Sequence, residues 1–162
     1  MGHIELRDLD DDDADAVFEM MRDREAIAMA AFTAQDPSDR LAFDARMRRL
    51  RNDPAVTQYV VTERGGFAGT VGAWTTDDGD REVTYWIARH AWGRGVATEA
   101  LRLLVSHQAT RPLYARVATH NQGSVAVLEK NGFSEVSRST AFAPGLGRET
   151  EEALYALVPT VE

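Results

Sequence analysis

Two glycines, Gly93 and Gly95, stand between a segment typical of a β-strand, Glu82–Ile87, and one typical of a long helix. Glycine lets the backbone approach a ligand closely because it has no Cβ. The first amides of a helix have no intrahelical acceptor, so the N–H groups of residues 94–98 can bind an anion at the positive end of the helix dipole. Arg94 adds a cation suited to a phosphate. The pattern indicates a phosphate site, although an ordinary glycine-containing connection would look similar.

Two common phosphate-binding loops do not fit this stretch. A Walker loop requires Gly-Lys-Ser/Thr, and no such triplet follows the glycines. A dinucleotide-binding fingerprint requires a third glycine, which is missing here, and a parallel sheet, whereas the preceding strands read as antiparallel.

Three further polar side chains could take part in a functional site. Asn121 is a good N-cap residue for a helix that ends at Asn131-Gly132. Ser124 lies in the first turn of that helix, where its hydroxyl either satisfies the backbone or is available for chemistry. Glu82 lies on the strand before the glycine turn, where a carboxylate could act as a general base or could simply be an exposed strand residue.

The elements that must position these residues follow from hydrophobic periodicity and turn signals. The expected strands are Ile4–Arg7, Val56–Glu63, Phe67–Thr75, Glu82–Ile87, Leu113–Ala118, Phe133–Phe142 and Glu149–Val158. The expected helices cover residues 11–22, 37–51, 97–105 and 124–130, with Leu41, Met47 and Leu50 facing inward on the second. Segment 26–35 is either one more helical turn or a loop over a pocket. The order β-α-α-β-β-β-α-β-α-β-β predicts an α+β or mixed α/β domain around a central sheet.

Composition narrows the class of protein. The 162 residues are enough for one domain, 1–162, and 44% of them are hydrophobic. The net charge of −8 disfavours a nucleic-acid or membrane surface, and the chain begins without a basic-then-apolar leader, so we expect a cytoplasmic protein. There is no cysteine, and four scattered histidines do not suggest a metal site.

The two polar segments together resemble the acyl-coenzyme-A signature of the GNAT N-acyltransferase superfamily. Gly93-Arg94-Gly95-Val96-Ala97 resembles the last five positions of its Q/R-x-x-G-x-G/A loop. Asn121–Phe133 resembles its N-x-x-[AS]-x-x-[LV]-x-E-K-x-G-F helix. Tyr85-Trp86-Ile87, with Trp92-Gly93, resembles the branch that includes ribosomal-protein N-terminal alanine acetyltransferases. Leu128 departs from the pattern, because many members carry a tyrosine acid there.

This resemblance implies a mostly antiparallel seven-stranded sheet flanked by about four helices, and acetyl transfer from acetyl-CoA to a primary amine by direct attack in a ternary complex. It implies that the strand at Trp86–Ala88 splays from the Leu113–Ala118 strand to admit the cofactor. No metal is implied. The residues expected to bind acetyl-CoA are Ile87, Ala88, Gly93, Arg94, Gly95, Val96, Ala97, Thr98 and Asn121.

Catalytic roles follow from the same resemblance. An alkyl amine is mostly protonated near pH 7 and must lose a proton before it attacks, and Glu82 is the expected base. By strand alternation Glu82 shares a face with Thr84 and Trp86. Ser124 and Asn121 are the expected polar contacts near the leaving sulfur.

The acceptor is not fixed by the sequence, and both a small-molecule amine and a protein N-terminal amine fit. Family members form the acceptor groove from regions corresponding to 26–35 and 143–148, so Met29, Phe32 and Trp74 are candidate lining residues. A homodimer is common in the family. Two other functions stay open, a non-catalytic acyl-CoA-binding sensor or regulatory module and a nucleotide-phosphate binder.

Overall fold

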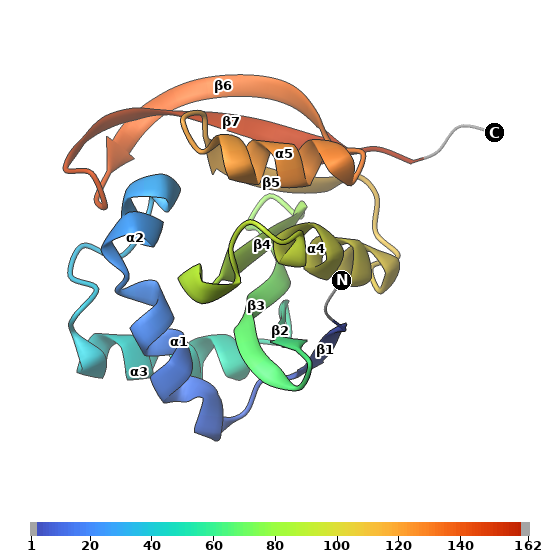
Figure 1. Cartoon of the computed structure of the whole chain (residues 1–162). Coiled ribbons are helices and arrows are strands. Elements are labelled where there is room, and N and C mark those ends of the chain that lie inside the picture. Colours follow the sequence, from blue (N-terminus) through green and yellow to red (C-terminus); the bar gives the residue numbers. More distant parts are fainter. Residues whose placement is uncertain (1–2, 160–162) are drawn as a thin grey trace.

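A computed structural model describes residues 3–159, in which seven strands form one sheet in the order β1-β2-β3-β4-β5-β7-β6 (Figure 1). The strands are β1 Ile4–Asp8, β2 Val56–Glu63, β3 Gly66–Thr75, β4 Arg81–Ile87, β5 Leu113–Ala118, β6 Ser134–Ala143 and β7 Arg148–Leu157. The α-helices are α1 Ala14–Met21, α2 Arg24–Ala30, α3 Arg40–Arg51, α4 Val96–Ser106 and α5 Gln122–Lys130, and two short 3-10 turns are η1 Asp11–Asp13 and η2 Arg89–Ala91. The mixed α/β class and the seven-stranded sheet are confirmed.

Five α-helices are present in the described residues, where about four were expected. The additional helix is α2, in the region that the sequence left open between a helical turn and a loop. The Asp23 side chain accepts hydrogen bonds from the backbone N–H groups of Glu25 and Ala26, so a new helix starts three residues after α1 ends.

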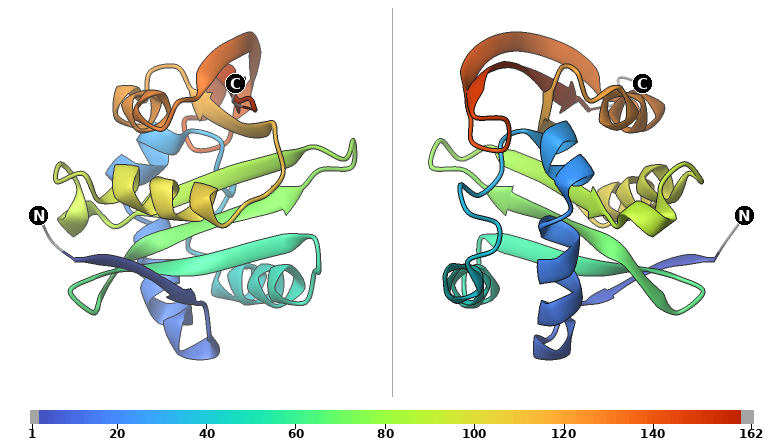
Figure 2. Two further views of the ribbon diagram at one scale, coloured as in Figure 1. Left: turned by 90° about the vertical axis from the view of Figure 1, so that its right-hand side faces the viewer. Right: turned by 60° about the vertical axis from the view of Figure 1, so that its left-hand side comes forward.

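Helices cover both faces of the sheet. In the left-hand view of Figure 2, α4 lies in front of the strands and the α1–α2 pair lies behind them. Strand alternation explains this arrangement, since neighbouring residues of β2 enter different clusters: Val61 packs in the cluster that contains α4 residues, and Val60 packs with Val17 and Met20 of α1. The two faces are therefore two separate environments, and alternate residues along each strand point to opposite faces.

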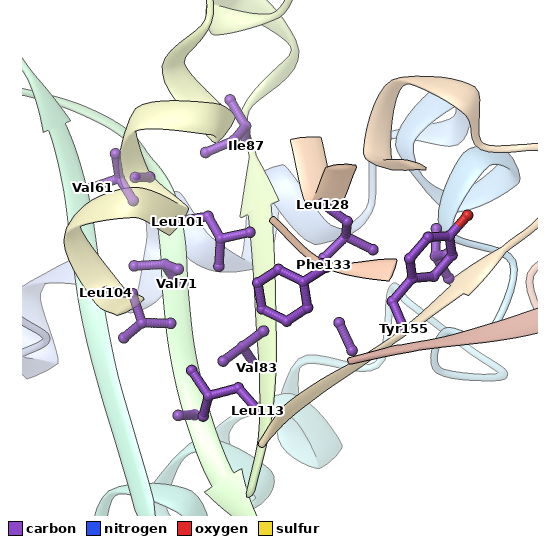
Figure 3. Close-up of a cluster of buried hydrophobic side chains, with 14 of the residues drawn as sticks. Val61, Val71, Val83, Ile87, Leu101, Leu104, Leu113, Leu128, Phe133 and Tyr155 are labelled. Atoms are coloured by element: carbon purple, nitrogen blue, oxygen red, sulfur yellow. The ribbon is translucent and has the colours of Figure 1, made fainter. Parts of the chain in front are cut away.

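The larger cluster joins the two halves of the sheet. Figure 3 shows Phe133 and Leu128, from the C-terminal half, beside Leu101 of α4 and Val83 of β4. Leu101 and Leu113 have no exposed surface, and Leu128 is only 1% exposed. Burying a side chain of this kind contributes roughly 1.5–3 kcal/mol each, so this packing is a main connection between the halves.

Strands β4 and β5 are neighbours but pair only briefly. Their parallel register contains two pairs, Arg81 with Leu113 and Glu82 with Tyr114. On its other side, β4 stays paired with β3 as far as Ile87. The strands therefore separate after Glu82, ahead of residues 86–88 where the splay was expected, and a gap opens toward the glycine turn.

One prediction about α3 is wrong. Leu41, expected to face inward, is 83% exposed. Phe43 and Met47 pack against the α1-side cluster instead, and a stripe at positions 43, 47 and 50 places residue 41 on the opposite side of the helix. No helix within residues 3–159 is both long and apolar enough to cross a membrane.

Candidate active site

The turn before α4 presents free backbone donors. Gly93 and Gly95 have φ values of +76° and +78°, in the left-handed region that side chains rarely adopt. A Cβ built at either position would meet no atom within 4 Å, so the turn faces open space. Within the described residues no backbone or side-chain acceptor bonds the N–H groups of 93–98, and Gly95 caps the helix without a side-chain bond. The donors that the sequence predicted are thus available to an anion.

A cleft of about 500 Å³ adjoins these donors. It runs between the glycine turn, the end of β4, the start of α5 and one side of α2. Its lining includes Met29, Tyr85, Trp86, Ile87, Gly93, Gly95, Val96, Ala97, Thr98, Asn121, Ser124 and Lys130. The structure therefore brings most of the expected site residues to one cavity, and these lining residues and free amides fit a ligand that carries both a diphosphate and an extended chain.

Arg94 is held outside this group of lining residues. One of its guanidinium nitrogens lies 2.8 Å from Oε1 of Glu63, at the end of β2, and 3.2 Å from the carbonyl oxygen of His90. The Glu63 side chain is only 15% exposed. The backbone of the turn faces the cleft, while the charge of Arg94 is paired beside it.

The backbone at Ile87 and Ala88 divides its hydrogen bonds between two sides. The Ala88 N–H donates to the carbonyl oxygen of Ala68 at 2.8 Å, so it faces β3. Because backbone groups alternate in direction along an antiparallel strand, the Ile87 N–H points the other way, into the gap left by β5. The indole N–H of Trp92 donates to the Ile87 carbonyl at 2.7 Å and holds the adjacent Ile87–Ala88 peptide. Ile87 and Ala88 were both expected to bind the cofactor, and of their two backbone N–H groups only that of Ile87 faces the gap as a free donor.

Glu82 lies on the face opposite α4 and is 7% exposed, which excludes the alternative of an exposed strand glutamate. Its carboxylate is 3.4 Å from Nε of Arg116 on β5, and the same guanidinium lies 3.9 Å from Glu152 on β7. Burial raises the pKa of the Glu152 carboxyl; the positive charge of Arg116 opposes this shift and the negative charge of Glu82 adds to it. Two carboxylates thus share one arginine.

Asn121 and Ser124 meet at the first turn of α5. The Asn121 Oδ1 accepts the backbone N–H of Ser124 at 3.2 Å, so Asn121 is an N-cap as well as a cleft residue. Ser124 Oγ lies 2.7 Å from the hydroxyl of Tyr85, which also donates to the Ser124 carbonyl oxygen at 2.9 Å. Burial raises the pKa of Tyr85 to about 12, while its hydrogen bond with Ser124 lowers it.

Tyr85 is the site residue that the sequence analysis missed as an individual contributor. It lies on the α4 side of β4 and packs against the larger cluster. A signal was present, because a tyrosine on a buried strand face needs a partner for its hydroxyl.

Leu128, at the position where a tyrosine is common in the family, does not reach the cleft lining. It is buried among core residues (Figure 3). The site therefore contains no phenol from α5 in the described residues, and Tyr85 brings one from β4 instead.

The two segments expected to form an acceptor groove are in contact. The N–H of Gly145, in the β6–β7 turn, donates to the carbonyl oxygen of Ala31 at 2.8 Å. Met29 lines the cleft, and Phe32 packs beside Ala31 in a small cluster. Trp74 is 42% exposed and pairs across strands with Glu82. Within residues 3–159 there is no group of three or more His, Asp or Glu side chains that could hold a metal.

Comparisons with known proteins agree with this geometry. The family model described as "Acetyltransferase (GNAT) domain" matches residues 3–134. YdaF of Bacillus subtilis (strain 168), which is named as a candidate ribosomal N-acetyltransferase, is 27% identical over 148 residues, covering 85% of this chain and 81% of that protein.

Two solved structures show the same fold. Spermidine N-acetyltransferase from Vibrio cholerae, in complex with CoA and spermine, superposes with a TM-score of 0.80 at 18% identity and covers 96% of this chain and 95% of its own. Ribosomal-protein-alanine N-acetyltransferase from Brucella melitensis gives a TM-score of 0.80 at 17% identity, with 96% and 99% covered. At these identities the likeness concerns the fold alone.

Proposed function

Because the chain belongs to the acetyltransferase (GNAT) domain family, we propose that it is an N-acetyltransferase that transfers an acetyl group from acetyl-CoA to a primary amine. The observation that carries the proposal is the row of uncapped amides at 93–98, which opens onto the cleft beside the β4–β5 gap. Acetyl-CoA supplies an activated thioester, so the amine attacks directly in a ternary complex.

The backbone holds the cofactor in this proposal. The N–H groups around Gly93 and Gly95, together with those of Val96, Ala97 and Thr98, bind the diphosphate through several hydrogen bonds and the dipole of α4. Arg94 contributes its positive charge at long range while it stays paired with Glu63. Ala88 shapes the entry to the gap through its bond to β3.

The Ile87 amide acts on the reacting carbonyl. It is a preorganised donor that points into the gap, where it stabilises the negative charge that develops on the thioester oxygen as the amine attacks. The Trp92 indole holds the next peptide along the chain, Ile87–Ala88, by its bond to the Ile87 carbonyl, and so restrains the backbone on the C-terminal side of this donor.

Glu82 takes a proton from the bound ammonium, directly or through one water, and the neutral amine then attacks the thioester. It is buried on the face of β4 opposite α4, and its ion pair with Arg116 keeps it oriented. Ser124 donates a hydrogen bond to the departing sulfur, and Asn121 fixes the turn that carries this serine.

The proposed acceptor is a primary amine, and the proposal names no single compound. The Vibrio relative is titled a spermidine N-acetyltransferase and the Brucella relative a ribosomal-protein-alanine N-acetyltransferase. Both a polyamine and a protein N-terminus therefore belong in an acceptor screen, and both react through a primary amine.

Thiol release tests the proposal. The chain has no cysteine, so a thiol reagent reports coenzyme A alone. We expect acetyl-CoA to raise the melting temperature by mass action, and at least one amine from a panel of polyamines, aminoglycosides, amino acids and short peptides to release thiol. Stabilisation by acetyl-CoA without thiol release from any amine would favour the non-catalytic sensor, and stabilisation by ATP but not by coenzyme A would favour the nucleotide binder.

A further inference from the structure

We infer that Tyr85 is a positioning residue that holds the Ser124 hydroxyl so that its proton points into the cleft toward the leaving sulfur. This inference rests on the proposed acetyl transfer and assigns a role to a residue that neither the family match nor the sequence motifs assign. Its geometric basis is the pair of short contacts from the Tyr85 hydroxyl to Ser124, 2.7 Å to Oγ and 2.9 Å to the carbonyl oxygen.

The two contacts allow two hydrogen-bond arrangements. In one, Tyr85 donates to the Ser124 carbonyl, and the serine hydroxyl donates to the phenol oxygen, which leaves no serine proton for the cleft. In the other, Tyr85 donates to Ser124 Oγ, and the serine proton is free to point at an acceptor. A thiolate that forms in the cleft favours the second arrangement, because a hydrogen bond to a charged acceptor is stronger than one to a neutral oxygen.

The environment suits a donor that stays protonated. Tyr85 lies within the larger hydrophobic cluster and lines the cleft, and its pKa is raised by burial to about 12. An ordinary thiol has a pKa of about 8.5, so the phenol does not give up its own proton to the sulfur. The serine hydroxyl is a weaker acid than the phenol, so Ser124 Oγ keeps its proton too and donates a hydrogen bond to the sulfur as the carbon–sulfur bond breaks. Coenzyme A leaves as a thiolate, which takes up a proton from water in the open cleft.

Tyr85 also supplies a phenol near the cleft, which Leu128 does not provide at the position where many family members have a tyrosine. The helix α5 offers no phenol to the cleft, because Leu128 is buried in the core. Strand β4 contributes a phenol next to the first turn of α5, where it acts through Ser124. A tyrosine serving only the core would be satisfied by the Ser124 carbonyl alone, and its removal would change stability without changing turnover.

A double-mutant cycle separates these roles. Tyr85→Phe keeps the ring and removes the hydroxyl, and we expect kcat to fall roughly ten-fold, the size of one hydrogen bond of about 1.4 kcal/mol, with little change in KM for acetyl-CoA. In the Ser124→Ala background the same change should lower kcat less than about two-fold, because the group through which Tyr85 acts is gone. Tyr59→Phe, on β2 outside the cleft lining, is the matched control and should leave kcat unchanged.

Nuclear magnetic resonance of ζ-¹³C-labelled tyrosine supplies a readout without turnover. We expect the Tyr85 signal to shift in Ser124→Ala and again when coenzyme A is added to the unmodified protein. Equal kcat values for Tyr85→Phe and the unmodified enzyme, equal losses in both serine backgrounds, or a Tyr85 signal that coenzyme A does not move would each overturn the positioning role. Failure of the unmodified protein to release thiol with any amine would instead reject the acetyl transfer on which the role depends.

Discussion

Nε of Arg116 lies 3.4 Å from Oε1 of Glu82, across the point where β4 and β5 stop pairing. The contact joins the two halves of the sheet at the base of the gap. It also places a cation next to the carboxylate that we assign as the base. The orientation of Glu82 therefore depends on both strands, and so does the proton transfer that we propose for it.

Glu82→Gln should remove the base while it preserves shape and burial. General-base catalysis typically contributes 10²–10⁴-fold, so we expect kcat to fall by roughly 100-fold or more. The affinity for coenzyme A should stay the same, because Glu82 is not among the residues that line the cleft. Steady-state thiol release and calorimetric titration measure the two effects. Glu19→Gln, on the exposed side of α1, is the control, and similar kcat values for both variants would remove Glu82 from the mechanism.

Gly95→Ala should weaken cofactor binding more than it weakens the fold. A Cβ at this position meets no protein atom within 4 Å, but it enters the space in front of the free amides and forces alanine into a left-handed conformation at φ +78°. The strain costs about 1 kcal/mol, and we expect the Kd for coenzyme A to rise at least roughly ten-fold.

Gly79→Ala is the matched control for this change. Gly79 has φ +87°, also has no atom within 4 Å of a built Cβ, and lies in the turn between β3 and β4. It should lose similar stability on thermal melting and bind coenzyme A normally. Equal Kd values in the two variants would mean that the glycine turn does not hold the diphosphate.

Leu128→Tyr should not restore a family-like acid. Leu128 is 1% exposed and packs among core residues, so the larger side chain overpacks the core and buries a hydroxyl. We expect the free energy of unfolding in urea to drop by about 1–3 kcal/mol, with no gain in kcat. Leu128→Met, which conserves volume, should cost less than about 1.5 kcal/mol. A tyrosine variant that is stable and faster would show that α5 can present this position to the cleft.

Asp13→Asn should destabilise the protein in a pH-dependent way. The carboxylate of Asp13 accepts two hydrogen bonds from Arg7, at 2.9 and 2.7 Å, and this contact lowers the pKa of Asp13. A lowered folded-state pKa means that the stabilisation is fully present above the unfolded value, near pH 4, and is lost as the pH falls through the folded value.

We therefore expect Asp13→Asn to lose about 1–2 kcal/mol at pH 7, a modest amount because Arg7 is 45% exposed. The difference between variant and unmodified protein should shrink below about pH 4. Urea unfolding at several pH values measures it. Asp12→Asn, an exposed acid in the same turn, is the control, and a loss that does not depend on pH would contradict the role of the ion pair.

The strands were predictable to within one or two residues because apolar alternation and turn residues encode them locally. Gly65-Gly66 and the Asp77–Asp80 turn separate β2, β3 and β4 where expected. The glycine turn and Asn121 were predictable for the same reason, since backbone freedom and capping are local properties.

What could not be predicted depends on contacts between distant segments. The pairing of Arg94 with Glu63 joins a turn to the end of β2, and no local pattern reveals it. The exposure of Leu41 depends on which side of α3 meets the sheet, and both sides of that helix carry apolar residues. The contact of Tyr85 with Ser124 was not predicted, because the two residues are 39 positions apart along the chain.

The brief pairing of β4 with β5 has a mechanical consequence. Past Glu82 the two halves of the sheet are joined by side-chain packing but by no main-chain hydrogen bonds between β4 and β5. A ligand that lies in this gap and bonds to the free edge of β4 at Ile87 would replace the main-chain hydrogen bonds that β4 and β5 do not make. The two halves of the sheet are then held together more rigidly when the ligand binds and less rigidly when it leaves. Each catalytic cycle is thereby coupled to a change in rigidity at the β4–β5 gap.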